Sequence, residues 1–393
     1  MSLYARRGVS AQKEDVHKAT EKLNKGLYPY AFCQIFPDFL GNNAEWVNLM
    51  HADGAGTKSI LAYLYWKQTG DVTVWKGIAR DAIVMNLDDL LCVGAYDNFL
   101  FSSTIDRNRR NIPEEVLTAI IDGSREFFEE LENLGVQVHY LGGETADVGD
   151  LVRTIAVNGT MAVRMKKVKL ITNQNIKSGN VIIGVASDGK ADYEAEYNSG
   201  IGSNGLTSAR HDLLSREYAI HFQESYDDLL REDIAYIGKY GLTDQIAVNY
   251  NGVHINTSVG KLLLSPTRTY APLMKLILER NFHSISGLIH CSGGGQTKCM
   301  KYLPGNLRVI KDDMFEPPPV FRLIQQSSGS DDREMYQVFN MGHRLEIFTE
   351  KSAADDLIAQ AKAFGLSAKI VGRVENAARK ELILWIKEKE IIY

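Results

Sequence analysis

Residues 46–65 read WVNLMHADGAGTKSILAYLY, and this stretch predicts a strand, a glycine-rich turn and a helix. Residues 46–51 have β character, residues 53–58 form the turn, and the apolar residues after it recur at helical spacing. Glycines in such a turn let backbone N–H groups approach a ligand closely, and the first turn of the helix adds partial positive charge. The stretch therefore predicts an α/β fold with an anion-binding turn. An ordinary strand-to-helix turn is the competing interpretation.

The turn does not fit a Walker A loop, which needs four residues between its first glycine and the Gly-Lys pair. Here only Ala55 separates Gly54 from Gly56. Lys58 nevertheless adds a full positive charge beside the turn, so the chemistry of the segment still suits a phosphate group.

The composition indicates a globular protein of two domains. A chain of 393 residues is longer than one ordinary core, and its 45% hydrophobic and 24% charged residues are typical of globular domains. The formal net charge of -5 does not favour a nucleic-acid partner. No uncharged apolar run approaches the roughly 20 residues of a membrane span, and no secretory signal is recognisable. We therefore expect a soluble, cytoplasmic protein with no membrane partner.

The remaining pattern alternates between helical and strand-like segments. In chain order, helix or strand is predicted for 78–92, 99–105, 113–134, 136–141, 151–163 and 181–186. The strand at 136–141 is expected to end in a turn at 142–145, and residues 382–393 predict one final strand. A polar, basic stretch at 166–179 separates two halves, so we expect an N-terminal domain over 1–167 and a C-terminal domain over 177–393.

Several acidic residues lie where carboxylates could reach a nucleotide. They are Asp81, Asp88, Asp89, Glu144 and Asp147. Magnesium prefers hard oxygen ligands and bridges to nucleotide phosphates through one or two carboxylates. Asp81 lies seven residues before Asp88 and eight before Asp89, so it can share a helix face with one of them. Solvated surface charge is the competing interpretation for each acid taken alone.

Two further glycine-rich segments, 199–205 and 292–297, could wrap an anion or serve as loops between elements. His283 and His290 flank an apolar stretch before the second segment. They share no cysteine or acid at ligand spacing, so a zinc site is not favoured. Core histidines or substrate contacts are the better interpretations.

Taken in order, these segments resemble the aminoimidazole ribonucleotide synthetase family, also called phosphoribosylformylglycinamidine cyclo-ligase. The resemblance runs from Tyr4 to about Phe348 and includes 53–58, 142–146, 203–205, 265–270, 293–295 and 334–342. The segments at 53–58 and 142–145 are shared with a wider ATP-using superfamily. Those at 265–270 and 334–342 are more particular to the cyclo-ligases.

The resemblance implies an α/β (α+β) fold of two domains. The sheet of the N-terminal α/β domain would pair with that of a second subunit, and the C-terminal α/β domain would contain a mixed sheet. It also implies a homodimer that uses ATP and Mg2+ to convert formylglycinamidine ribonucleotide into aminoimidazole ribonucleotide, ADP and phosphate in purine biosynthesis.

The same resemblance assigns roles to residues of this chain. The implied catalytic residues are Asp53, Lys58 and Asn204, and the implied magnesium ligands are Asp53, Asp89 and Glu144. The implied ATP-binding residues are Gly54, Gly56, Thr57, Lys58, Gly143, Thr145 and Asp147. Arg268 and the loop 293–295 are candidates for binding substrate phosphate or for ordering a loop.

The chain departs from the family pattern mainly on the substrate side. Gly202 stands where the family has a histidine before Ser-Asn-Gly, and Ala156 stands where an aspartate is expected. The family's Gly-x-Gly-Met becomes Gly342-His343-Arg344-Leu345. A thiamine-monophosphate kinase-like enzyme and a non-catalytic nucleotide-binding paralogue therefore stay open as alternatives.

Overall fold

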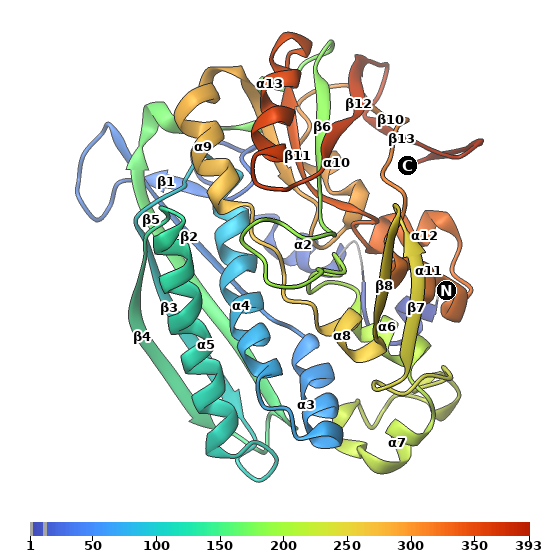
Figure 1. The fold of residues 1–393 in the computed structure, drawn as a ribbon. Helices are drawn as coiled ribbons and strands as arrows, with labels where there is room; N and C mark the ends of the chain where they lie inside the picture. The colour runs from blue at the N-terminus through green and yellow to red at the C-terminus, as the bar shows by residue number, and fades with distance from the viewer. Residues whose placement is uncertain (1–2, 11–13) are drawn as a thin grey trace.

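Two sheets with helices packed against them form the body of the protein (Figure 1). The computed structural model describes residues 3–10 and 14–393. Within these residues, the N-terminal sheet has the strand order β1-β2-β5-β3-β4, and only the β3–β4 pair is parallel. Its strands are β1 (Ile35–Pro37), β2 (Trp46–Gly54), β3 (Phe99–Arg107), β4 (Val138–Asp147) and β5 (Ile155–Lys166).

Helices cover one face of the N-terminal sheet. They are α3 (Lys58–Thr69), α4 (Val74–Leu91) and α5 (Glu114–Asn133). α4 packs on β2 and β5, and α5 packs on α4 and β4. In α5 the buried residues Val116, Ile120, Phe127 and Leu131 recur at intervals of four or seven positions, which gives one apolar stripe toward the sheet.

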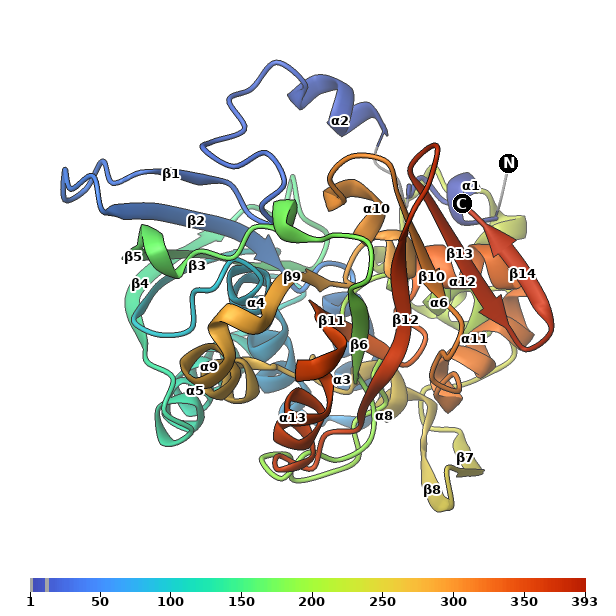
Figure 2. The same ribbon diagram turned by 90° about the horizontal axis from the view of Figure 1, so that it is seen from above.

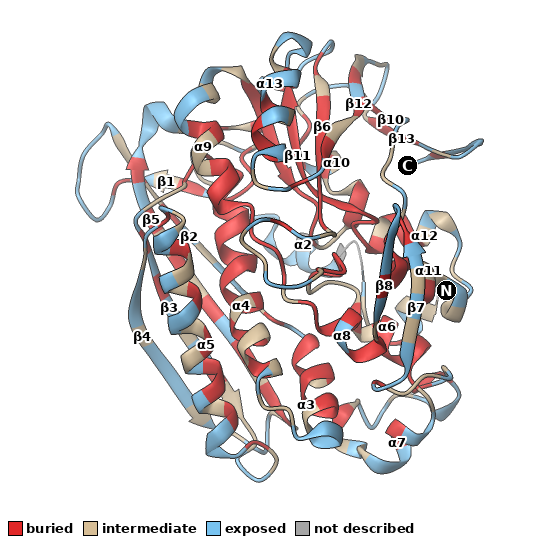
Figure 3. Cartoon of the chain, in the orientation of Figure 1, coloured by how far each residue is buried: buried red, intermediate tan, exposed pale blue. Residues whose placement is uncertain are grey.

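The opposite face of this sheet is exposed. Met50, Ala162 and Leu100 form one row across β2, β5 and β3, and the Met50 and Leu100 residues are 66% and 40% exposed. β4 is exposed along most of its length (Figure 3). Exposed apolar patches of this kind are typical of surfaces that bind another protein.

The C-terminal sheet has the strand order β14-β13-β10-β12-β6-β11-β9. Its strands are β6 (Val181–Ala186), β9 (Ile285–His290), β10 (Leu307–Lys311), β11 (His343–Thr349), β12 (Ala368–Asn376), β13 (Glu381–Ile386) and β14 (Lys389–Ile392). β9 and β11 are buried throughout. A separate hairpin of β7 (Gln245–Tyr250) and β8 (Val253–Ser258) projects from the body (Figure 2).

The other helices are short. They are α1 (Leu3–Arg6), α2 (Glu14–Thr20), α6 (Leu206–Leu213), α7 (Glu217–His221), α8 (Val259–Leu264), α9 (Ala271–Asn281), α10 (Cys299–Tyr302), α11 (Pro319–Ser328), α12 (Asp332–Val338) and α13 (Lys351–Lys362). Across the described part of the chain, no helix combines the length and apolar character needed to cross a membrane.

Two aspartates of α4 hold the segment 265–270 between the domains. Asp81 Oδ1 accepts hydrogen bonds from the N–H and the hydroxyl of Thr267, at 2.7 and 2.6 Å. Asp88 accepts from the hydroxyl of Thr269 at 2.7 Å and from the N–H of Tyr270 at 3.2 Å. Both aspartates are buried acceptors for this segment, so the magnesium role considered for Asp81 and Asp88 does not fit their contacts.

The predicted two-domain α/β fold with mixed sheets is confirmed, and two local predictions are wrong. β4 does not stop before Gly142. An irregularity in the β3–β4 pairing, with Gly142 at φ +85°, lets the strand continue to Asp147. The final segment is two strands rather than one, because the chain turns back at Lys387, which has a φ of +56°.

Candidate functional site

The turn at 53–58 lies at the end of β2, and close backbone approach explains its first glycine. A Cβ at Gly54 would lie 2.1 Å from Asn158 Oδ1 and 2.6 Å from the carbonyl oxygen of Val157 on β5. Gly56 has a left-handed φ of +57°. Thr57 then joins the turn to the C-terminal domain, since its Oγ1 lies 2.9 Å from Oγ1 of Thr207 on α6. The turn thus sits at the junction of the two domains.

Lys58, the first residue of α3, is fully buried. Its ammonium donates to Asp81 Oδ1 at 2.9 Å and to the carbonyl oxygen of Ser265 at 2.5 Å. Burial lowers the pKa of Lys58, and the neighbouring Asp81 opposes that shift. The predicted contact between Lys58 and an ATP phosphate does not fit this position, because the ammonium is enclosed between α4 and the segment 265–270.

Asp89 joins two histidines that come from different domains. Its Oδ1 accepts from His290 Nδ1 at 2.6 Å, and its Oδ2 lies 3.2 Å from His51 Nε2. Burial alone would raise the pKa of the Asp89 carboxyl, but the hydrogen bonds from His290 and His51 hold it well below its usual value. Both oxygens are engaged, so the predicted magnesium role of Asp89 does not fit this arrangement.

Arg344 fixes which ring nitrogen of His290 donates and which accepts. Its Nε donates to His290 Nε2 at 3.0 Å. Because a guanidinium has donors only, His290 Nε2 must accept the hydrogen bond from Arg344. His290 Nδ1 is then the ring nitrogen that donates a hydrogen bond to Asp89. His290 therefore connects the C-terminal domain to the carboxylate of Asp89.

His51 faces an acceptor at each ring nitrogen. One is Asp89, and the other is Asn86 Oδ1, 3.2 Å from His51 Nδ1. The amide nitrogen of Asn86 donates to three backbone carbonyls, which fixes the orientation of that amide. Burial works to lower the pKa of His51, but Asp89 outweighs it and raises that pKa. The charged imidazolium is therefore the favoured form.

Asp53 occupies the solvent-exposed end of this network. It lies two residues after His51 on β2, so the two side chains leave the strand on the same face. Its carboxylate accepts the N–H of Gly54 at 2.7 Å, and its charge adds to the rise in the pKa of His51. An exposed carboxylate beside a glycine turn has the chemistry of a magnesium ligand.

Two loops of the C-terminal domain approach each other at the same junction. A Cβ at Gly293 would lie 3.4 Å from Asn204 Nδ2. Gly294 and Gly295 have left-handed φ values of +98° and +48°. Asn204 lies three residues before Thr207, which contacts Thr57. The structure thus gathers Asp53, Gly54, Gly56, Thr57 and Asn204 around one junction.

The remaining predicted residues lie elsewhere, on β4. They are Gly143, Glu144, Thr145 and Asp147. Three strand spacings separate β4 from β2, about 14 Å at the usual distance between strands. Glu144 belongs to the row of Gly54, Asn158 and Thr104, whereas Asp53 belongs to the next row.

Adjacent rows of a sheet point to opposite faces. The carboxylates of Glu144 and Asp53 therefore leave the sheet on opposite sides, and a single chain does not bring them together. Asp147 is paired with Arg107, at 2.7 Å between its Oδ1 and Arg107 Nε. Gly143 has a packing reason of its own, because a Cβ there would lie 2.2 Å from the carbonyl oxygen of Ser103.

Arg268 orders a loop. Its guanidinium contacts Glu194 and donates to the carbonyl oxygens of Ala186, Asp188 and Gly189 at 3.2, 2.7 and 3.0 Å. It is 1% exposed. Of the two predicted roles, substrate phosphate binding and loop ordering, only the second fits these contacts.

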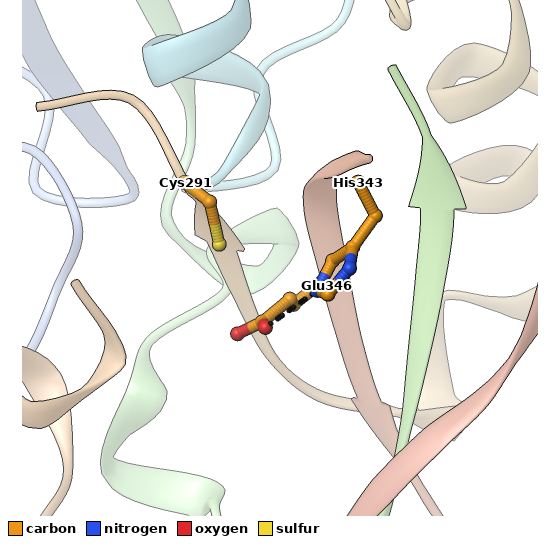
Figure 4. Close-up of side chains that lie close together, drawn as sticks. All are labelled: Cys291, His343 and Glu346. Atoms are coloured by element: carbon orange, nitrogen blue, oxygen red, sulfur yellow. Dashed lines mark hydrogen bonds and ion pairs between the residues drawn. The ribbon is translucent and has the colours of Figure 1, made fainter. Parts of the chain in front are cut away.

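Cys291, His343 and Glu346 form a compact cluster within the C-terminal sheet (Figure 4). Their possible ligand atoms lie within 4.8 Å of one another, and all three residues are buried. However, Glu346 lies between the other two, accepts from His343 Nε2 at 3.0 Å and pairs with the ammonium of Lys311. That ammonium already balances the charge of Glu346, so the cluster is a buried ion pair and not an open metal site.

Sequence reasoning missed His51 and Arg344 and left the role of His290 undecided. His290 and Asp89 lie 201 residues apart in the chain and meet only because the two domains dock. No sequence pattern within one segment can predict a contact between residues so far apart. The one available signal was the position of His290, directly before the glycine-rich loop at 292–297.

Known proteins resemble this chain in both sequence and fold. A phosphoribosylformylglycinamidine cyclo-ligase from Methanocaldococcus jannaschii is 28% identical over 84% of this chain and 78% of its own length. One from Methanosarcina barkeri is 27% identical over 97% of this chain and 98% of its own.

Among solved structures, AaThiL complexed with AMPPCP and TMP has a TM-score of 0.53 at 11% identity, over 97% of this chain and 93% of its own. T. maritima PurL complexed with FGAR has a TM-score of 0.53 at 13% identity over 97% of this chain. The chain spans about half of the PurL length, 49%. At these identities the likeness concerns the fold alone.

The family models match both halves. The N-terminal domain of AIR synthase related proteins matches residues 40–164, and the C-terminal domain matches residues 177–384. The two matches meet at the polar stretch between the sheets and together cover most of the chain, which therefore belongs to the family of AIR synthase related proteins.

Proposed function

We propose that this chain is a phosphoribosylformylglycinamidine cyclo-ligase (EC 6.3.3.1), which uses ATP in de novo purine biosynthesis. Formylglycinamidine ribonucleotide and ATP would give aminoimidazole ribonucleotide, ADP and phosphate. An amidine nitrogen attacks the formamide carbon and closes the imidazole ring. The formamide oxygen, phosphorylated at the expense of ATP, leaves as phosphate.

The junction described above carries this proposal. It places the Asp53 turn beside Asn204, the loop 293–295 and the Asp89–His290 pair. Catalysis of phosphoryl transfer depends largely on positioning and charge neutralisation, and the junction offers a carboxylate, an amide, an imidazolium and glycine-rich turns. The named cyclo-ligase from Methanosarcina barkeri resembles the chain across both domains that form the junction.

The residues present fit ATP and Mg2+ only in part. Bound magnesium would neutralise phosphate charge during the transfer. Asp53 fits a magnesium ligand by its chemistry and its exposure, and the turn at 54–57 offers backbone N–H groups to the ATP phosphates. Asn204 would orient the substrate, and Asp89 would hold His51 and His290. Lys58 would stabilise the domain junction through its bonds to Asp81 and Ser265 and would not contact phosphate.

The proposal includes a homodimer. Its support is the exposed apolar row of Met50 and Leu100, on the sheet face that also carries Glu144. A second subunit covering that face would bury the row. Glu144, together with Gly143, Thr145 and Asp147 at the exposed edge formed by the same strand, would then serve a nucleotide bound partly by the partner.

Purified protein with formylglycinamidine ribonucleotide as the only acceptor tests the proposed function. We expect ADP and phosphate release that depends on this substrate, together with aminoimidazole ribonucleotide. ATP binding without turnover would support the non-catalytic paralogue instead. ATP-dependent phosphorylation of thiamine monophosphate, with no ring closure, would support the kinase-like alternative. Growth of a purine-requiring strain that lacks the cyclo-ligase checks the result in cells.

A further inference from the structure

Arg344 is a buried guanidinium with one nitrogen left without a partner. Its Nε donates to His290 and its Nη2 donates to the carbonyl oxygen of Arg268. Its Nη1 is buried and has no hydrogen-bond partner among the described residues. A buried donor without an acceptor lowers the stability of the protein, because its lost hydration is not replaced. An acceptor from outside the chain would restore that hydrogen bond.

The charge of Arg344 is also poorly compensated. Its nearest carboxylate contact is a long one, 4.0 Å from Nη2 to Asp88 Oδ2, which is beyond hydrogen-bond distance. Asp88 meanwhile accepts hydrogen bonds from Thr269 and Tyr270. Arg268, by contrast, contacts Glu194 directly. A buried cation without a hydrogen-bonded anion is stabilised when an anion binds to it.

The backbone at Gly202 lies beside this nitrogen, and no side chain stands between them. A Cβ at Gly202 would lie 3.3 Å from Arg344 Nη1 and 4.0 Å from Arg344 Cδ, and no other atom of the described residues would lie within 4 Å. Gly202 is buried, whereas the next residues, Ser203, Asn204 and Gly205, are partly exposed. Gly202 and Arg344 are both departures from the family pattern, and the structure brings them together.

We propose that Arg344 Nη1, next to Gly202, binds an oxygen of a phosphate ester, and that this ester belongs to the substrate. The inference rests on the proposed function, because the ribonucleotide substrate carries such a phosphate. A guanidinium is well suited to phosphate oxygens and stays charged when buried. The loops 203–205 and 293–295 would complete the site, since a Cβ at Gly293 would lie only 3.4 Å from Asn204 Nδ2.

Gly202→Ala tests the proposal without removing the Arg344–His290 bond. The added methyl group would lie 3.3 Å from Nη1 and would obstruct an acceptor there. We expect KM for formylglycinamidine ribonucleotide to rise roughly 10- to 100-fold, with KM for ATP unchanged, because one hydrogen bond to a charged group is lost. The matched control is Gly179→Ala, which carries a similar left-handed strain (φ +93°) with nothing within 4 Å. Equal substrate KM values in the two variants would overturn the proposal.

A binding measurement separates this proposal from the proposed function. Inorganic phosphate should raise the thermal unfolding midpoint of the wild type and of Gly179→Ala, and should raise it less in Gly202→Ala. Arg344→Lys should also lose the phosphate effect, which covers the case in which Gly202→Ala folds poorly. If the wild type turns over no substrate but shows this pattern, the proposed function fails and the phosphate site stands. If phosphate stabilises all four proteins equally, the site fails.

Discussion

The two regions predicted to bind one nucleotide differ in almost every physical respect. At the domain junction, Asp89 is buried, accepts hydrogen bonds from His51 and His290, and is tied to the C-terminal domain through Arg344. On β4, Glu144 is exposed at the edge of a sheet whose outer face is open. One region is built by the folding of a single chain. The other has the right chemistry but is incomplete until something covers it.

The largest expected effect is on stability and separates the two regions directly. Lys58→Met should lower the free energy of unfolding by about 3–5 kcal/mol, because it leaves the carboxylate of Asp81 buried without its partner. Glu144→Gln should change that free energy by less than about 0.5 kcal/mol, as expected for an exposed side chain. Denaturant unfolding measures both. A similar loss of unfolding free energy in the two variants would contradict the difference between the buried domain junction and the exposed strand β4.

The second prediction concerns turnover. Asp53→Asn should lower kcat at least ~100-fold, because it removes the carboxylate proposed to hold magnesium. Its unfolding midpoint should stay close to that of the wild type, since Asp53 is exposed. Asp355→Asn, on the exposed side of α13, is the control and should keep full activity. Unchanged turnover in Asp53→Asn would remove the magnesium role from the junction.

The fold could be predicted from the sequence because each helix and strand follows from the residues of its own segment. The strand, turn and helix at 46–65 and the apolar stripe of α5 follow from periodicity and glycine placement alone. The site was predicted less well because its contacts are not local. Lys58 lies beside the turn in sequence, but its ammonium is buried at the domain junction and donates to Asp81. His51 has a role only through its contacts with Asp89 and Asn86.

The third prediction concerns the open face. Leu100→Lys should weaken the proposed dimer roughly 10- to 100-fold, because it places a charge within the apolar row. Analytical ultracentrifugation over a range of concentrations measures this change. Leu229→Lys is the control, since Leu229 is 90% exposed and belongs to none of the strands. Equal assembly of both variants would mean that the exposed row is not the contact between subunits.

The smallest expected effect is a partial recovery of activity in mixed dimers. It tests whether the domain junction of one subunit and β4 of the other form one site. Asp53→Asn and Glu144→Gln should each be inactive alone if both carboxylates serve the nucleotide. If each site takes Asp53 from one subunit and Glu144 from the other, a mixed dimer contains one site with both carboxylates intact. Random mixing of equal amounts should then restore about a quarter of wild-type activity, since half of the dimers are mixed and each has one intact site of two.

The control for subunit exchange is a mixture of Asp53→Asn with Asp53→Asn/Glu144→Gln, which contains no intact site and should stay inactive. Recovery should also disappear when Leu100→Lys is added to both partners, because no mixed dimer would form. Full inactivity of the first mixture, despite proven exchange, would mean that the two carboxylates do not come from different subunits. Because the single chain directs them to opposite faces of its sheet, Glu144 would then have no part in the site at the junction.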